Sequence, residues 1–382
     1  MKKILTLAYL ASCVITLTAC SKTKQVKNVS IIHEEEFGGV YIKKTIEEFN
    51  EKGFNYGDSV NIKFSNNYII YDVPYYNGYY VDAGSTLLVA YPGYDYIKAC
   101  VNYGDDLFVT CNLDESMKAT ITLNQAGKYK DIQEASDIHY YDERSKYTTD
   151  SEFANFREIK VGNIKDGILY RSASPCDNKH NRAHYTDTLI SEAKIDFIMN
   201  LADSKAKIDS YIETYNLEEI SPYFVNLYRN NDCCLAFEND TLSSEVDPIG
   251  LNMNYMSNEF RDKVAMGFKE TLNANGPILI HCLEGKDRTG FVCMVIEALM
   301  GATYTEIVDD YMLTYDNYYG IDKADYRYST IKSRNIDSML NFLTGGEAYM
   351  ISDLTNYARS YLINGGMTDS EVTSLINYLK KD

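Results

Sequence analysis

Short runs of apolar and β-branched residues, separated by turn-forming residues, dominate the early part of the chain. Residues 59–64 and 86–91 are two such strand-like runs, with Gly, Asn, Asp and Pro between them. Tyrosines are dense in the same region, and Asn77-Gly78 is typical of a hairpin turn. Tyrosines on half-buried strands explain this density better than a ligand-binding aromatic patch does. The pattern predicts a small all-β domain over residues 51–140.

From residue 150 to residue 382 the pattern changes to strand-like runs that alternate with helical sequence. Residues 195–201 and 278–281 are mainly apolar, and each run precedes helical sequence, as strands of a parallel sheet do. Before the second run, apolar side chains recur every four residues from Phe260 onward, and Ser257 is placed to cap that helix. We therefore expect an α/β domain with a central, partly parallel sheet flanked by helices.

The first residues indicate an export signal. A short basic start precedes the apolar residues 4–17, a stretch too short to span a membrane comfortably. Its end, Leu-Thr-Ala-Cys20, resembles the lipobox of bacterial lipoproteins, in which the cysteine is lipidated after cleavage; the alternative is a plain cleaved signal with a chance cysteine. We expect residues 1–19 to be a signal peptide and residues 20–50 a tether and lead-in. This interpretation places the protein outside the cell, lipid-anchored to the outer face of a bacterial membrane.

Charge and cysteine content exclude some classes of partner. The formal net charge of -18 leaves no basic field for nucleic acid, so any charge that binds phosphate must be concentrated in a local site. After the leader, the cysteines show no paired Cys-x-x-Cys spacing, and zinc is not indicated. Cys100 with Cys111, or Cys233 with Cys234, could be bridged only if geometry permits; otherwise they are buried small hydrophobes.

Residues 281–290, with the sequence His-Cys-Leu-Glu-Gly-Lys-Asp-Arg-Thr-Gly, carry the chemistry. They lie between the buried strand and an apolar helix expected over residues 291–300. A tight loop in this setting points successive backbone N–H groups at one phosphate, and Gly285 permits the tight path. The same field favours the thiolate of Cys282, which makes it the nucleophile. The planar fork of Arg288 grips two phosphoryl oxygens.

Neighbouring residues have supporting roles. The Thr289 hydroxyl can donate to the sulfur, and His281 can hold the loop through its imidazole. Lys286 has two interpretations: it lies on the exposed side of the loop, or it binds a second phosphate. The polar passage 172–182 either lines the pocket or forms a surface loop. The residues expected to contact substrate beside the catalytic ones are His281, Leu283, Glu284, Gly285, Lys286 and Thr289.

This segment resembles the signature loop of protein tyrosine phosphatases, His-Cys-x5-Arg-Ser/Thr-Gly. More narrowly, Gly-Lys-Asp-Arg-Thr-Gly is similar to the loop of bacterial secreted phosphatases of the tyrosine and lipid-phosphatase group. The resemblance runs from about Phe153 to the C-terminus. Residues 155–157 and 169–172 match the upstream motifs of that group, and residues 309–311 match its post-loop helix.

The resemblance implies a protein-tyrosine-phosphatase-like fold and phosphomonoester hydrolysis through a cysteinyl-phosphate, without metal or cofactor. Phosphotyrosine protein is the leading substrate class. Because some members of the group have dual specificity, a phosphoinositide or inositol phosphate is the alternative. A pseudophosphatase that binds phosphorylated ligands without turnover is the non-enzyme alternative.

Several aspartates are candidates for the proton donor to the leaving oxygen. Asp287, beside Arg288, is favoured, since related lipid phosphatases are thought to use an aspartate at this place. Asp203 is the alternative general acid, although the chain departs from the group's pattern at Asn200 and Ala202. Asp232 could lie on a movable loop.

Overall fold

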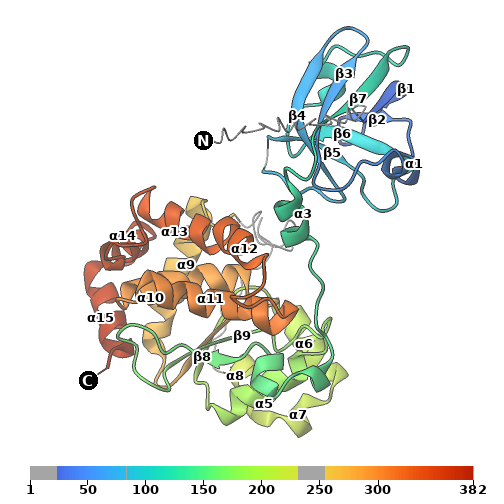
Figure 1. Ribbon diagram of the computed structural model, residues 1–382. Coiled ribbons are helices and arrows are strands. Elements are labelled where there is room, and N and C mark those ends of the chain that lie inside the picture. The colour runs from blue at the N-terminus through green and yellow to red at the C-terminus, as the bar shows by residue number, and fades with distance from the viewer. Residues whose placement is uncertain (1–23, 83, 231–253, 382) are drawn as a thin grey trace, which may run out of the picture. The chain divides into compact units, whose positions relative to one another are not determined.

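The computed structural model describes residues 24–82, 84–230 and 254–381, which form two compact units that meet between Lys130 and Asp131 (Figure 1). In these residues no helix is both long and apolar enough to cross a bilayer. The expected signal peptide, Cys20 and Asp232 lie outside the described residues, as do Cys233 and Cys234.

The first unit is a closed barrel of seven strands in the order β1-β2-β6-β5-β4-β3-β7. Most neighbours pair antiparallel, whereas β4 and β5 pair in parallel. Apolar side chains from all the strands fill its interior. The elements are β1 Gln25–His33, β2 Val40–Ile42, α1 Ile46–Glu51, β3 Ser59–Phe64, β4 Ile69–Tyr76, β5 Thr86–Val89, β6 Ile97–Val101, α2 Leu107–Thr110 and β7 Lys118–Gln125.

The barrel agrees with the expected small β domain, but it begins earlier than predicted. Strands β1 and β2 lie within residues 20–50, the segment expected to be a tether. Val26 and Ile31 of β1 are buried in the barrel core, where β1 pairs with β7 and closes the barrel. Because only alternate side chains of a barrel strand point inward, the polar ones between them made this segment look like a linker.

The expected hairpin at Asn77-Gly78 is also wrong. Strand β4 ends just before it, and β4 pairs with β5 in parallel. Parallel strands cannot be joined by a two-residue turn, so β4 and β5 need a longer connection than a hairpin provides. Cys100 and Cys111 are buried free thiols, which excludes the bridged alternative for this pair.

The second unit is a four-stranded sheet covered by helices. The strand order is β10-β11-β9-β8, with β10, β11 and β9 parallel and β8 antiparallel. The strands are β8 Arg157–Glu158, β9 Leu169–Ser172, β10 Phe197–Asn200 and β11 Ile278–His281. The helices are α3 Lys130–Ser136, η1 Arg144–Lys146, α4 Asp150–Phe153, α5 Ala183–Glu192, α6 Lys205–Thr214, α7 Leu217–Ile220, α8 Pro222–Asn230, α9 Asn258–Glu270, η2 Thr271–Asn273, α10 Asp287–Leu299, α11 Tyr304–Tyr319, α12 Tyr328–Arg334, α13 Ile336–Thr344, α14 Thr355–Asn364 and α15 Asp369–Leu379.

Helices lie on both faces of this sheet, with α10 and α11 on one side and α5 and α8 on the other (Figure 1). Every residue of α10 is buried, which explains its apolar sequence. Strand β11 has the predicted bounds, β10 lies within the predicted run, and the Ser257 side chain accepts a hydrogen bond from the Phe260 N–H at the start of α9. The mixed α/β architecture is therefore confirmed.

Two expected boundaries differ from the structure. The second unit starts at Asp131 rather than near residue 150, because the connecting segment packs on it: the Tyr141 N–H donates to the Tyr318 carbonyl at 2.7 Å. Helix α10 starts at Asp287 instead of residue 291. Asp287 and Arg288 are therefore first-turn helix residues, not loop residues.

Candidate active site

The motif loop follows the central strand of the parallel sheet. Strand β11 is buried over all four residues between β10 and β9, and the loop at its carboxyl end leads directly into α10. Gly285 has a φ of 68°, in the left-handed region. A Cβ there would lie 2.1 Å from the Ser172 carbonyl oxygen at the end of β9, so the expected need for glycine is confirmed.

The carbonyl groups of this loop are held from outside it or by the following helix. Three carbonyls are held from outside the loop: the Ser174 N–H donates to the Leu283 carbonyl at 3.0 Å, Asn155 Nδ2 to the Glu284 carbonyl at 3.0 Å, and Arg171 Nη2 to the Gly285 carbonyl at 2.8 Å. At the start of the loop, the His281 ring Nδ1 lies 3.3 Å from the Cys282 carbonyl oxygen. At its end, the Gly290 N–H of the following helix donates to the Lys286 carbonyl at 2.7 Å. Because a trans peptide is planar with C=O and N–H on opposite sides, the next N–H groups point the other way, into the loop. Such a ring of amides at a helix N-terminus is suited to an oxyanion.

Three motif side chains, those of Cys282, Arg288 and Thr289, are buried. Cys282 and Arg288 are each only 3% exposed. Arg288 Nη1 donates to the Leu201 carbonyl at 2.8 Å, just after β10, which fixes the guanidinium. The Thr289 hydroxyl is fully buried and has no hydrogen-bond partner among the described residues. A buried donor without a protein acceptor is available to the sulfur or to a bound anion.

His281 and Asp203 lie behind the loop, and both are fully buried. His281 Nε2 is 2.8 Å from the Tyr228 hydroxyl; burial lowers the pKa of His281, although Asp203, 3.8 Å away, opposes this. Asp203 accepts from the Ser174 hydroxyl and pairs with Lys207 Nζ at 2.9 Å. These contacts connect the end of β10 to the passage after β9.

Lys286 is fully buried, so its interpretation as an exposed residue is wrong. Its Nζ lies 2.9 Å from the Tyr319 hydroxyl, 3.1 Å from Glu284 Oε2 and 4.0 Å from Asp287 Oδ2. Burial opposes the charge, but Asp287 and Glu284 together hold the pKa of Lys286 well above its usual range. Tyr140 donates to Glu284 Oε1 at 2.7 Å, so both charges of the Glu284–Lys286 pair are engaged within the protein.

The segments matched by the family resemblance meet in a second buried cluster. Asp310 on α11 accepts from Arg157 Nε at 2.8 Å and from Arg171 Nη1. Burial opposes ionisation, but the two arginines hold the pKa of Asp310 far below its usual range. Burial, and then the nearby Asp310, raise the pKa of Glu297 well above its usual range. Since Arg171 also donates to Gly285, this cluster positions the catalytic loop.

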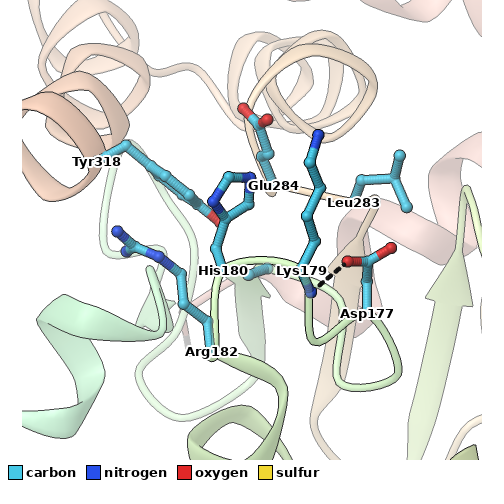
Figure 2. A pocket seen from close by; sticks show the side chains of 8 residues that line it. Asp177, Lys179, His180, Arg182, Leu283, Glu284 and Tyr318 are labelled. Carbon is cyan, nitrogen blue, oxygen red and sulfur yellow. Dashed lines mark hydrogen bonds between the residues drawn. The ribbon is translucent and has the colours of Figure 1, made fainter. Parts of the chain in front are cut away.

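A small pocket of about 60 Å³ opens beside the loop (Figure 2). The polar passage after β9 lines it, which settles the choice between pocket wall and surface loop. The sequence predicted only that this polar passage could line the pocket. It did not identify which of its side chains do so, because polarity was the only signal. The main lining residues are Asp177, Lys179, His180, Arg182, Glu284 and Tyr318.

A family model described as the tyrosine phosphatase family matches residues 151–380. The chain belongs to the tyrosine phosphatase family. The matched segment contains the whole motif loop and excludes the barrel. The second unit of this phosphatase therefore carries the family's activity, phosphoester hydrolysis.

Among solved structures, this phosphatase is similar to an uncharacterized conserved protein from Thermotoga maritima, at 17% identity and a TM-score of 0.23. The alignment covers 27% of the phosphatase and 37% of that chain. In the described part of the phosphatase, no three His, Cys, Asp or Glu side chains are grouped to hold a metal ion.

Proposed function

We propose that this phosphatase hydrolyses phosphotyrosine in proteins through a cysteinyl-phosphate on Cys282. The observation that carries the proposal is that donors outside the loop hold three successive loop carbonyls, those of Leu283, Glu284 and Gly285. This bonding supports a loop whose amides face one phosphate at Cys282. Arg288 adds a fixed guanidinium to the same site. These donors match the charge that spreads over the phosphoryl oxygens in the transition state.

The reaction proceeds in two steps. The Cys282 thiolate attacks phosphorus in line, the S–P bond forms, and the P–O ester bond breaks. Asp287 protonates the departing tyrosyl oxygen. Water then attacks the phosphocysteine, phosphate leaves, and the Thr289 hydroxyl stabilises the released thiolate. Two lower barriers replace one high barrier.

Asp287 is a better candidate for the acid than Asp203. Asp287 is 6% exposed in the first turn of α10, adjacent to Arg288. Asp203 is fully enclosed and already bonded to Ser174 and Lys207, so a proton on it would disrupt those contacts. The contacts of Asp203 support a structural role.

The alternative substrate, a phosphoinositide or inositol phosphate, keeps the support of the family resemblance but loses the support of Lys286. One interpretation of Lys286 was that it binds a second phosphate. Because Lys286 is fully buried and paired with Glu284, its charge is already compensated. Measured turnover of a phosphorylated substrate would exclude the pseudophosphatase alternative, because a pseudophosphatase binds its ligand without hydrolysing it.

The decisive experiment compares wild type with Cys282→Ser and Arg288→Lys on a phosphotyrosine peptide in EDTA. We expect Cys282→Ser to abolish turnover while it still binds vanadate, because the amides and Arg288 remain. Arg288→Lys should lose both, since a lysine cannot reproduce the planar fork. Residual hydrolysis above a few per cent in Cys282→Ser would exclude Cys282 as the nucleophile.

We also propose that the protein is exported and anchored through lipidated Cys20. The apolar leader and its lipobox-like end support this location. Mass spectrometry of the membrane fraction should find a mature N-terminus at modified Cys20. An unmodified N-terminus at another residue would contradict the anchor.

A further inference from the structure

The pocket beside the catalytic loop contains two carboxylates, and both are neutralised by the protein. Asp177 Oδ2 lies 2.6 Å from Lys207 Nζ. Burial alone would raise the pKa of Asp177, but the bond to Lys207 and further hydrogen bonds lower it below its usual value. Glu284 is paired with Lys286 and accepts from Tyr140. Because each carboxylate is paired with a lysine, both repel an anion in the pocket only weakly.

The cations of the pocket are not equally available. Arg182 is 1% exposed, lies 3.8 Å from the Tyr318 ring and donates to the Tyr141 carbonyl at 2.9 Å, so it is part of the protein interior. His180 Nδ1 is 2.8 Å from Asp142 Oδ2, and its ring packs at a tilt against the Tyr140 ring, with 4.1 Å between the centroids. These contacts make His180 a fixed wall of the pocket.

Lys179 has a side chain that, unlike those of Arg182 and His180, is not held by other residues in the described part of the chain. Its backbone N–H donates to Asp177, but its side chain makes no hydrogen bond or ion pair with any residue that the structure describes. Figure 2 shows this side chain extending towards the loop that carries Leu283 and Glu284, the two residues after Cys282. An ammonium without a partner among the described residues thus lines the pocket beside Leu283 and Glu284, next to the proposed phosphate site.

We propose that Lys179, beside the His180 wall, forms a subsite for the carboxylate of an aspartate or glutamate that flanks phosphotyrosine in a peptide substrate. This inference rests on the proposed function and adds a specificity determinant to it. The subsite favours acidic phosphopeptides, because an anion there meets one free cation and two neutralised carboxylates.

The lining favours a peptide over a phosphorylated inositol ring. Ala173, Leu283 and Tyr318 present largely apolar surface, and Leu283 is 40% exposed. Ring hydroxyls need hydrogen-bond acceptors, yet the carboxylates of Asp177 and Glu284 already have partners. A peptide side chain needs only the terminal contact with Lys179.

The test measures kcat/KM for two phosphotyrosine peptides that differ only in glutamate or glutamine at the flanking positions. We expect wild type to prefer the acidic peptide by about three- to fivefold at low salt, the range for one exposed ion pair, and less at high salt. Lys179→Gln should reduce this ratio to about one. Lys380→Gln, which removes an exposed lysine directly after α15 that does not line this pocket, should keep it.

Each other outcome overturns the proposal. Equal rates of wild type on both peptides would leave the phosphotyrosine phosphatase intact and exclude the subsite. No hydrolysis of either peptide would exclude the proposed function together with the subsite. If Lys179→Gln instead impairs turnover of a soluble inositol bisphosphate and keeps the peptide ratio, the second anion is a ring phosphate.

Discussion

Asp187 on α5 is a buried carboxyl whose ionisation should destabilise the fold. Its side chain is enclosed, and Oδ1 accepts from the Thr188 hydroxyl at 3.2 Å. Oδ2 has no hydrogen-bond partner in the described part of the chain, and the exposed His184 ring Nδ1 lies 3.8 Å from it. Burial raises the pKa of Asp187 to about 6.

The sign and size of the effect follow from this shift. A carboxyl with a raised pKa in the folded state stabilises the fold below its unfolded pKa of about 3.9, and this stability is lost as pH rises to about 6. A shift of about two pH units corresponds to about 3 kcal/mol in total. By pH 5 about half of this is already lost, so roughly 1 kcal/mol remains to be lost between pH 5 and pH 8.

Asp187→Asn should remove this pH dependence, because asparagine does not ionise. The assay is urea unfolding of the full chain followed by far-UV circular dichroism, since the sequence contains no tryptophan. We expect the stability difference between Asp187→Asn and wild type to grow in favour of the variant from pH 5 to pH 8. Asp166→Asn, at an exposed position of the same unit, is the matched control and should follow wild type. Parallel pH profiles of wild type and Asp187→Asn would refute the reasoning.

Two further predictions concern the catalytic loop. Gly285→Ala should lower kcat about a hundredfold, because the added Cβ would lie 2.1 Å from the Ser172 carbonyl oxygen and must displace the loop amides. The circular dichroism spectrum should stay native. A near-normal kcat would show that the loop tolerates the shift. Asp287→Asn should slow phosphotyrosine hydrolysis about a hundredfold but affect an activated phenyl phosphate much less, since only a poor leaving group needs the acid. Asp203→Asn is its comparison, and the leaving-group dependence in that variant alone would transfer the acid role to Asp203.

The sequence predicted well those parts of the fold that depend on residues only a few positions apart in the chain. The run at 278–281 is apolar because β11 is covered on both faces, and Ser257 caps α9 through a bond to a residue three positions away. The start of the barrel could not be predicted in this way. Strand β1 acquires its partner β7 about ninety residues later, and of its own residues only Val26 and Ile31 are buried.

The same distinction explains which parts of the site could be predicted from the sequence and which could not. Motif spacing was enough to nominate Cys282 and Arg288, because their roles depend on one short loop between a strand and a helix. The direction of the Lys286 side chain was not predictable, since it is decided by Tyr319 on α11 and by Glu284, which Tyr140 in turn holds. Such partners become neighbours only after folding.

The partners of the loop carbonyls show why the motif needs the rest of its unit. Asn155, Arg171 and Ser174 hold three successive carbonyls, and each lies more than a hundred residues before the loop. Arg171 is in turn fixed by Asp310, which follows the loop on α11. A ten-residue segment with this sequence would have no reason to point its amides inward without these donors. The family match over residues 151–380 spans all of them, so the unit that belongs to the family is also the unit that shapes the anion site.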